Sequence, residues 1–195
     1  MNLTTFVKFE INKIAKMKFA ITLLLSVITM FSVAQVPIVV KWYSIEEAIK
    51  LNEKAPRKLY VDVYTDWCGW CKKMDSNTFS NPVIAKMLNE NFYPVKLNAE
   101  DKKDITYKGH VYVNKETGAR STHEFAVALL QGKLSYPSTV FMDENNAPIT
   151  YLAGYLTPEQ LEPILEFFSS NSYKTEKWED FVKHFTSQLS PQKKE

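Results

Sequence analysis

A short apolar strand that runs directly into two closely spaced cysteines is the feature that most constrains how this chain can fold. The strand covers residues 58–65, Lys-Leu-Tyr-Val-Asp-Val-Tyr-Thr, where β-branched and aromatic side chains surround one isolated acid, Asp62. This composition predicts a buried strand. Cys68 and Cys71 follow within Asp66-Trp-Cys-Gly-Trp-Cys71, which we expect to begin a helix. The two cysteines are therefore predicted to lie where a buried strand meets a helix.

Two cysteines at the start of a helix are arranged for thiol–disulfide exchange. The unpaired N–H groups and the positive end of the helix dipole favour the thiolate of Cys68 over its thiol. Cys71 follows one turn later, close enough to attack a mixed disulfide on Cys68 and release the substrate. One sulfur is expected to attack and the other to resolve.

Two other uses of the cysteines, a zinc site and a structural disulfide, fit the sequence less well than a redox role. A zinc site usually needs four ligands, but the chain has no second Cys-x-x-Cys, and His110, His123 and His184 are scattered without ligand spacing. A purely structural disulfide would close a tiny loop and stabilise the fold little. We therefore favour a redox-active pair that needs neither a metal nor an organic cofactor, because the two cysteines carry the electrons.

The N-terminal segment has the organisation of a secretory signal. An uncharged apolar run over residues 19–34 follows three lysines and ends in Ser32-Val-Ala34. This pattern predicts cleavage after Ala34 and a periplasmic or secreted protein. The alternative is an uncleaved membrane anchor, since no charge occurs between Lys18 and Lys41, but Pro37 interrupts this stretch. Met17 is an alternative start to Met1.

Length and charge exclude several classes of protein. The 195 residues suit one domain plus a tail, and two cysteines are too few for a disulfide-dense scaffold. The near balance of 24 basic and 22 acidic side chains argues against nucleic-acid binding. Cleavage after Ala34 would remove four lysines and one glutamate and change the net charge from +2 to −1.

The remaining patterns predict alternating helices and strands, which is typical of an α/β fold with a mixed sheet. The predicted strands cover residues 58–65, 92–97, 138–142 and 148–152, and the alternating run 105–113 followed by the turn-like stretch 114–118 suggests a hairpin-like excursion. The predicted helices cover residues 44–53, 121–130 and 157–168, and two further helical segments meet at Asn81-Pro82. A last amphipathic helix is predicted to pack on the domain through one face, which carries Trp178, Phe181, Val182 and Phe185.

Three segments resemble the thioredoxin superfamily. Residues 64–74 resemble the active-site segment of thioredoxin-like domains of bacterial envelopes, such as the C-terminal domain of the thiol:disulfide interchange protein. Tyr136-Pro-Ser-Thr139 resembles the loop before the family's fourth strand, in which the proline is cis and faces the cysteines. Residues 141–155 are similar to the family's final hairpin and the glycine near its end.

The resemblance covers about residues 42–168 and implies a thioredoxin fold, a mixed central β-sheet flanked by helices. The chain departs from a minimal thioredoxin by an insertion before the cis-proline loop, within residues 101–120, and by an extra C-terminal helix. We expect an N-terminal extension and signal peptide over residues 1–34, a thioredoxin-like domain over 35–173 and a C-terminal helical extension over 174–195.

The resemblance also implies roles for single residues. Cys68 would be the nucleophile, Cys71 the resolving thiol, and Pro137 would supply backbone contacts to the substrate. Asp62 stands where thioredoxins keep a buried carboxylate that assists proton transfer, and Lys96 matches the lysine that approaches it. An acid within an apolar strand is costly unless it is paired or functional, which agrees with this role. The alternative is that Asp62 lies at a strand end and faces water.

Three aromatic residues are candidates for substrate binding. Trp70 stands where thioredoxin has a proline, and the residues between the cysteines tune the reduction potential. Tyr136 is bulkier than the residue usual before the cis-proline and is expected to narrow the substrate groove. Trp67 and Trp70 could form an exposed platform for the substrate, with packing of Trp67 on the sheet as an equal alternative.

We therefore expect a thiol:disulfide oxidoreductase that acts on disulfide-containing exported proteins, most readily as a reductase or isomerase. A reductase outside the cytoplasm would need a membrane thiol reductase as its electron donor. We expect a monomer that binds no nucleic acid. The alternative function is a protein-binding or chaperone-like module on the same fold, whose groove around Trp67, Trp70 and Tyr136 holds unfolded chains.

Overall fold

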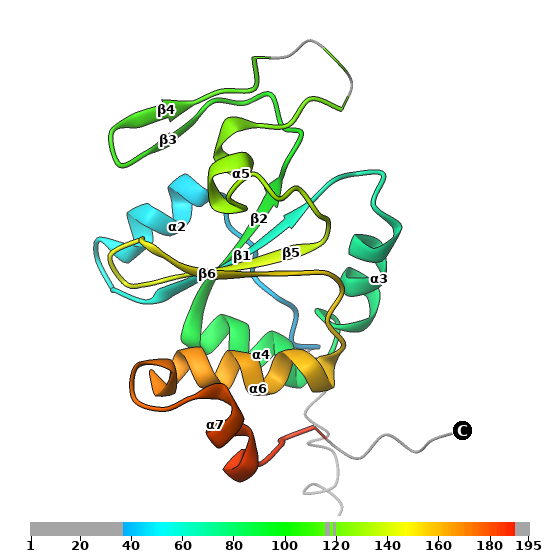
Figure 1. The fold of residues 1–195 in the computed structure, drawn as a ribbon, viewed down its shortest axis with the longest axis vertical. Coiled ribbons are helices and arrows are strands. Elements are labelled where there is room, and N and C mark those ends of the chain that lie inside the picture. Colours follow the sequence, from blue (N-terminus) through cyan, green and yellow to red (C-terminus); the bar gives the residue numbers. More distant parts are fainter. Residues whose placement is uncertain (1–36, 116–117, 119, 190–195) are drawn as a thin grey trace, which may run out of the picture. The chain divides into compact units, whose positions relative to one another are not determined.

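A four-stranded mixed sheet forms the centre of the protein in a computed structural model, which describes residues 37–115, 118 and 120–189 (Figure 1). The strand order is β2-β1-β5-β6, in which β1 pairs parallel with β2 and antiparallel with β5, and β5 pairs antiparallel with β6. The strands are β1 (Lys58–Tyr64), β2 (Phe92–Asn98), β5 (Ser138–Met142) and β6 (Pro148–Ala153). The predicted signal peptide lies outside the described residues.

Helices cover both faces of this sheet (Figure 1). In chain order they are α2 (Ile45–Asn52), α3 (Gly69–Asn77), α4 (Pro82–Asn91), α5 (Glu124–Leu129), α6 (Pro158–Ser169), the 3-10 helix Ser172–Lys174 and α7 (Trp178–His184). Helices α2 and α5 lie on one side of the sheet, and α4 and α6 lie on the other. The α/β architecture with helices on a mixed sheet, expected from the sequence, is confirmed.

The alternation of side chains along β1 accounts for these two layers. Leu59, Val61 and Val63 belong to the core between the sheet and α2, β3 (Ile105–Tyr107) and α5, whereas Tyr60 belongs to the core under α3, α4 and α6. Successive residues of a strand point to opposite faces of the sheet. Asp62 therefore points to the same face as Tyr60, the face that α3 covers.

Side-chain caps begin three of the helices where the sequence predicts them. Ser44 and Glu47 form the capping box of α2, and Thr157 and Gln160 form that of α6. The Asn81 side chain accepts hydrogen bonds from the first backbone N–H groups of α4, and Pro82 occupies the first helical position. Such caps satisfy N–H groups that have no partner within the helix.

Within residues 101–120, where the sequence predicts an insertion, the structure has a small hairpin. The hairpin pairs β3 (Ile105–Tyr107) with β4 (His110–Tyr112) and turns at Lys108-Gly109, both of which have positive φ. The turn therefore lies inside the alternating run rather than at residues 114–118. Lysine is not typical of turns, and a single glycine such as Gly109 is too weak a signal to locate a turn in the sequence.

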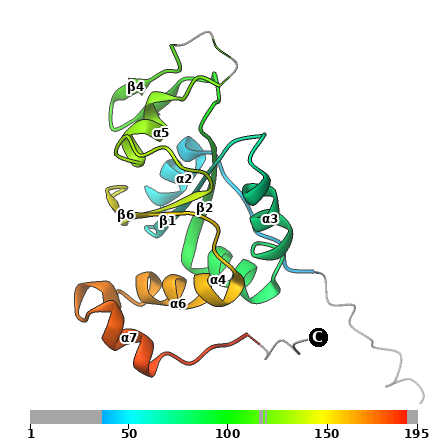
Figure 2. The same ribbon diagram turned by 45° about the vertical axis from the view of Figure 1, so that its right-hand side comes forward.

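The C-terminal helix packs on α6, at the end of the molecule away from β3 and β4 (Figure 2). Phe181 is buried, and its ring lies 5.0 Å from that of Phe167. Val182, however, is 41% exposed, so the prediction that it shares the buried face of α7 is wrong. With only two turns, α7 buries one large side chain fully.

The described residues from Ile38 onward form one compact unit. A boundary at residue 173 stays a prediction. Within the described part of the chain, no helix is long and apolar enough to cross a membrane.

Candidate active site

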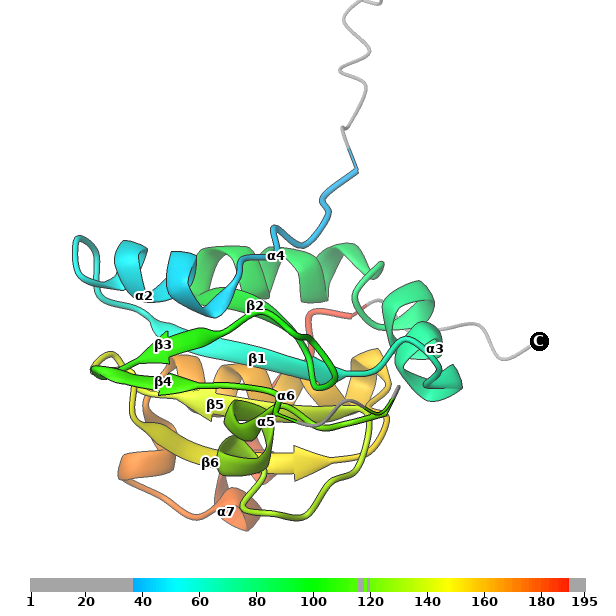
Figure 3. The same cartoon turned by 90° about the horizontal axis from the view of Figure 1, so that it is seen from above.

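Cys68 and Cys71 form a disulfide at the first turn of α3. This helix follows directly after β1 (Figure 3). A backbone hydrogen bond from the Cys68 N–H to the Thr65 carbonyl turns the chain after the strand, at 3.1 Å. Cys68 is the N-cap residue of α3, and the Cys71 N–H donates to its sulfur over 3.0 Å. The helix start thus directs a backbone donor at the Cys68 sulfur.

This geometry favours a thiolate at Cys68 once the disulfide is reduced. A negative sulfur at the N-cap would accept the Cys71 N–H and lie at the positive end of the helix dipole. Both cysteines are nearly buried, with 4% of Cys68 and 2% of Cys71 exposed. A substrate that reacts with Cys68 must therefore bind to the residues around the sulfurs.

Asp62 lies within β1 and is 1% exposed, so the alternative that it faces water at a strand end is wrong. In the sheet register it stands opposite Lys96 of β2 and Thr139 of β5. The Lys96 ammonium donates to its Oδ2 at 2.6 Å. Its other oxygen, Oδ1, is buried and has no hydrogen-bond partner among the described residues.

Burial raises the pKa of the Asp62 carboxyl from an ordinary value of 3.8 to about 6, and the charge of Lys96 offsets part of that rise. The carboxylate of Asp75 acts in the same direction as burial. A carboxyl group with a pKa near 6 exchanges its proton readily at neutral pH. Asp62 is therefore able to take up and give back a proton.

Lys96 links Asp62 to the helix of the cysteines. Its ammonium also donates to Asp75 of α3 and lies 4.8–5.1 Å from the ring centres of three aromatic residues, Trp42, Tyr64 and Phe79. Burial alone would lower the pKa of Lys96, but its two carboxylate partners outweigh burial and raise that pKa. The ammonium stays charged, so it keeps its pairing with both acids.

Asp75 and the aromatic rings around Lys96 are features that the sequence reasoning missed. Asp75 follows Cys71 by four residues, a spacing that places two side chains on one face of a helix. That spacing was a usable signal. The rings of Trp42 and Phe79 come from distant segments and carried no local signal.

Pro137 follows a cis peptide bond from Tyr136 and precedes β5 directly. Its carbonyl accepts a hydrogen bond from the Gly154 N–H over 2.8 Å, which ties the loop to the end of β6. Trp70, Tyr136, Pro137, Gly154 and Tyr155 line a recess of about 270 Å³. Three predicted site residues therefore meet in one recess, together with Tyr155, which no sequence pattern singles out as a site residue.

Trp67 does not pack on the sheet but lies 52% exposed beside the cysteines. Its indole N–H donates to the Glu100 carboxylate over 2.9 Å, and the Arg120 guanidinium lies 5.0 Å from its ring centre. Its ring also meets that of Tyr136 edge to face at 6.2 Å. Trp70 is 63% exposed, so both tryptophans are open to a partner.

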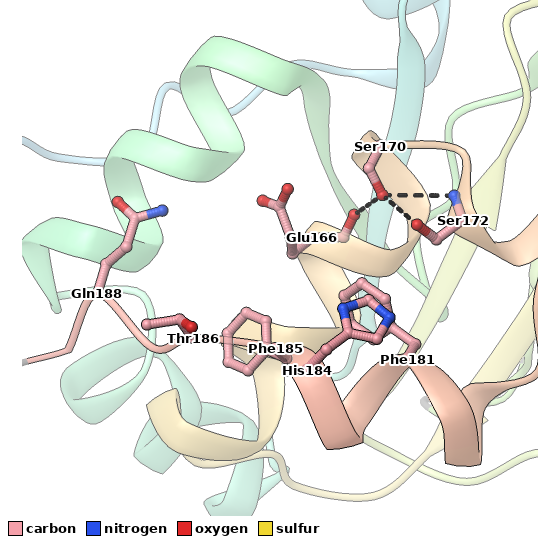
Figure 4. A pocket seen from close by; sticks show the side chains of 8 residues that line it. All are labelled: Glu166, Ser170, Ser172, Phe181, His184, Phe185, Thr186 and Gln188. Carbon is pink, nitrogen blue, oxygen red and sulfur yellow. Dashed lines mark hydrogen bonds between the residues drawn. The ribbon is translucent and has the colours of Figure 1, made fainter.

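A second hollow, of about 390 Å³, lies between α6 and α7 (Figure 4). Its two serines hydrogen-bond within the chain: the Ser170 hydroxyl donates to the Glu166 carbonyl and bonds to the hydroxyl and the N–H of Ser172. His184 pairs with Glu176 at 2.9 Å. Within the described residues, no group of three or more His, Cys, Asp or Glu side chains could hold a metal ion. The cysteine pair is the stronger candidate for chemistry.

Comparison with protein families agrees with the fold and with this site. Residues 30–192 match the family model Thioredox_DsbH, described as "Protein of unknown function, DUF255". Among solved structures, a thioredoxin from Thermus thermophilus superposes with a TM-score of 0.50 at 16% identity, over 76% of this chain and 98% of that one. The likeness shows a thioredoxin fold.

Curated relatives are similar over part of their length. The thiol:disulfide interchange protein DsbD of Pectobacterium atrosepticum is 27% identical over 118 residues, which cover 60% of this chain and 17% of DsbD. The uncharacterized protein B0495.5 of Caenorhabditis elegans is 27% identical over 129 residues, which cover 66% of this chain and 16% of that protein. The chain spans about a sixth of the length of each of these relatives.

Proposed function

Because the chain belongs to the Thioredox_DsbH (DUF255) family and has a thioredoxin fold, we propose that it is a thiol:disulfide oxidoreductase acting through Cys68 and Cys71. The observation that carries the proposal is the disulfide at the start of α3, with the Cys71 N–H directed at the Cys68 sulfur. A donor in that place lowers the free energy of the Cys68 thiolate, which is the attacking species in thiol–disulfide exchange.

The proposed reduction proceeds in two displacements. The Cys68 thiolate attacks one sulfur of the substrate disulfide, which forms a mixed disulfide and releases the first substrate thiolate. The Cys71 thiol then loses its proton and attacks the Cys68 sulfur, which forms the Cys68–Cys71 disulfide and releases the second thiolate. The cysteine pair gives up two electrons, and both substrate thiolates take up protons.

Asp62 is proposed to accept the proton of Cys71. Its carboxyl lies on the face of the sheet that α3 covers, and Cys71 and Met74 are the buried residues of that helix. The unpartnered Oδ1 is free to hold a proton, and burial places the pKa of Asp62 at about 6. A base with a pKa near the working pH is best suited to this transfer.

Pro137 and the exposed aromatic residues are proposed to bind the substrate chain. The loop of Pro137 is anchored to Gly154 and shares its recess with Trp70, so backbone contacts there would align a substrate disulfide with Cys68. Trp67, whose ring contacts that of Tyr136, would extend this binding surface beyond the recess.

The direction of electron flow is proposed to be reductase or isomerase, on disulfides of exported proteins in the periplasm or outside the cell. A reductase needs a fresh pair of electrons after each turnover, which a membrane thiol reductase would supply as a dithiol. The protein is proposed to work as a monomer.

Reduction of insulin by the purified protein, with dithiothreitol as the electron donor, tests the enzymatic proposal. We expect the wild-type protein to accelerate the reaction and both Cys68→Ser and Cys71→Ser to lose this acceleration. Val182→Ala, which changes an exposed side chain on α7, is the matched control and should retain it. Equal, negligible rates for the wild type and both cysteine variants would refute the proposal.

The order of attack is tested by trapping. In Cys71→Ala nothing resolves the mixed disulfide, so adducts on Cys68 should accumulate and should vanish on reduction. In Cys68→Ala no such adducts should form. Adducts that accumulate only in Cys68→Ala would reverse the two roles.

A protein-binding module is a second candidate function, favoured by the exposure of Trp67 and Trp70. Large apolar side chains on a surface mark interaction sites. If this is the function, the wild type and Cys68→Ser should suppress the aggregation of an unfolded client protein equally. Neither should accelerate the reduction of insulin.

A further inference from the structure

The ammonium of Lys96 has aromatic partners in addition to its two carboxylates. It offers three N–H donors. Two of them reach Asp62 and Asp75, and no other hydrogen bond of this ammonium occurs among the described residues. The rest of the ammonium faces three aromatic rings, whose centres lie 4.8–5.1 Å from its nitrogen: Trp42, Phe79 and Tyr64. We call these three rings the aromatic cage.

The aromatic cage holds a positive charge without neutralising it. The negative face of an aromatic ring attracts a cation, most strongly in tryptophan, and the attraction grows where water is excluded. The Lys96 side chain is only 20% exposed, so water replaces little of the contact that the rings provide. The full positive charge therefore stays available to Asp62, whose Oδ2 lies 2.6 Å from the nitrogen.

Trp42 reaches the cage because the segment before α2 is bound to β2. The Tyr43 N–H donates to the Pro94 carbonyl over 2.9 Å, and the Tyr43 carbonyl accepts from the Lys96 N–H over 3.1 Å. Neighbouring residues of an extended segment point to opposite faces. Tyr43 accordingly packs against the core on the side of α2, and Trp42 packs against the core on the side of α3. The ring of Trp42 also meets that of Phe79 edge to face at 4.9 Å.

We propose that Trp42 is a positioning residue for the proton transfer from Cys71, because its ring holds the Lys96 ammonium against Asp62. The inference rests on the proposed function, in which Asp62 accepts that proton. A nearby ammonium favours the carboxylate form of Asp62, which is the form that can accept a proton. Without the ring, the ammonium would turn toward solvent to complete its hydration, and Asp62 would hold its own proton more tightly.

A substitution of Trp42 changes no charge in this group of residues. Apart from Lys96 and Asp62, the titratable groups that face one another here belong to β1 and α3: Tyr60, Tyr64 and Asp75. Lys41, the charged neighbour of Trp42, lies 5.1 Å from the ring centre of Tyr43 instead. An effect of Trp42 on Asp62 must therefore pass through the position of Lys96 or through access of water.

Carbon NMR of the Asp62 carboxyl in the oxidised protein tests the cage without any turnover. Trp42→Leu keeps a large apolar side chain but removes the ring, so we expect the pKa of Asp62 to rise by about half a unit. Trp42→Phe keeps a ring and should stay closer to the wild type. Tyr43→Leu, in the same segment but on the other side of the sheet, is the matched control and should leave this pKa unchanged.

Three outcomes of the NMR measurement would overturn the inference. A lower pKa of Asp62 in Trp42→Leu would show that Trp42 acts by excluding water, and an unchanged pKa would show that it does not hold Lys96. An equal change in Trp42→Leu and Trp42→Phe would show that the aromatic face is irrelevant. Trp42→Met, with its adaptable apolar side chain, replaces Trp42→Leu if the latter does not fold.

A kinetic measurement connects the cage to the chemistry. The reduced protein is mixed with the disulfide of thionitrobenzoate, from which Cys68 releases a first thionitrobenzoate and Cys71 a second. Because the pKa of Asp62 is about 6, we expect the second release in Trp42→Leu to be about twofold slower than in the wild type at pH 6 and equal at pH 8. The same slowing at both pH values would indicate a general structural defect and overturn the role of Trp42.

The two measurements separate this inference from the proposed function. A raised pKa of Asp62 in Trp42→Leu, with no acceleration of insulin reduction by the wild type, would support the contact of Trp42 with Lys96 and refute the oxidoreductase. Insulin reduction by the wild type, with the same pKa of Asp62 in both proteins, would refute the role of Trp42 alone.

Discussion

At the scale of single residues, the ionised carboxyl of Asp62 lowers the stability of the fold. The carboxyl is buried, so its charged form has lost its hydration, and a single ammonium replaces part of that loss. The cost of burying this partly paired acid should be measurable as a pH-dependent stability.

The pKa of Asp62 rises from 3.8 unfolded to about 6 folded, so between these values the folded chain keeps a proton that the unfolded chain has lost. Stability therefore falls as pH rises through this window, by about 3 kcal/mol for about two pKa units. Asp62→Asn cannot ionise. We expect it to exceed the wild type by up to about 3 kcal/mol at pH 8 and to match it below pH 4, in urea unfolding of the oxidised proteins.

Asp104→Asn, a change of an exposed acid, is the matched control for Asp62→Asn and should show no such pH dependence. A stability difference between Asp62→Asn and the wild type that is the same at pH 4 and pH 8 would contradict the assignment of a raised pKa to Asp62.

Lys96 and Asp75 act on Asp62 in opposite directions. Removing the ammonium with Lys96→Met should raise the pKa of Asp62 further, by about one unit or more, whereas Asp75→Asn should lower it by less, since Asp75 is half exposed. Lys96→Arg keeps the charge and should leave the pKa closer to its wild-type value. Carbon NMR of the Asp62 carboxyl measures each titration, and shifts of equal sign in Lys96→Met and Asp75→Asn would refute the network.

At the scale of elements, α4 shows how a short helix depends on its cap. The Asn81 side chain accepts from the N–H groups of Val83 and Ile84, at 2.9 and 3.4 Å. We expect Asn81→Ala to lower the free energy of unfolding by about 1 kcal/mol, measured by urea unfolding, and Asn81→Asp to lose little of it. Lys86→Ala on the exposed side of the same helix is the control. Equal losses in Asn81→Ala and Lys86→Ala would show that the cap contributes nothing.

Elements whose start depends on neighbouring residues were predictable from the sequence. The caps at Ser44, Asn81 and Thr157 lie within three residues of the N–H groups that they satisfy, so their residue types suffice to locate the helices. The turn of the β3–β4 hairpin and the exposure of Val182 depend instead on what packs nearby. No local pattern encodes that packing.

The candidate site divides in the same way. The cysteines, Asp62 and Pro137 form contiguous patterns with their neighbours, and the structure places them at the end of β1, within it and before β5. The contacts of Tyr155 with Asn77 join residues 78 positions apart. Such a pair becomes visible only when the fold brings Tyr155, just after β6, to α3.

At the scale of the whole molecule, the last described residues close over a buried acid on α6. Glu162 is 1% exposed, and its two carboxylate oxygens accept hydrogen bonds from the Ser187 hydroxyl and the Gln188 N–H, each at 2.5 Å. Because both partners come from the segment after α7, Glu162 ties this segment to α6.

Removal of the segment after Phe185 should therefore destabilise the whole domain. Hydrogen bonds to a charged group contribute about 1.5–3 kcal/mol each, and water that reaches the bared carboxylate would return part of this, so we expect a net loss of about 2 kcal/mol in urea unfolding. In a Glu162→Met background the same truncation should cost less than about 1 kcal/mol, because no carboxylate remains to be satisfied.

Truncation after Leu189 keeps Ser187 and Gln188 and serves as the matched control, which should retain the stability that their hydrogen bonds to Glu162 provide. If truncation after Phe185 costs as much in the Glu162→Met background as in the wild type, the segment stabilises the domain by apolar packing rather than through Glu162. An unchanged midpoint in both backgrounds would instead show that the hydrogen bonds of Ser187 and Gln188 to Glu162 make no net contribution to the stability of the domain.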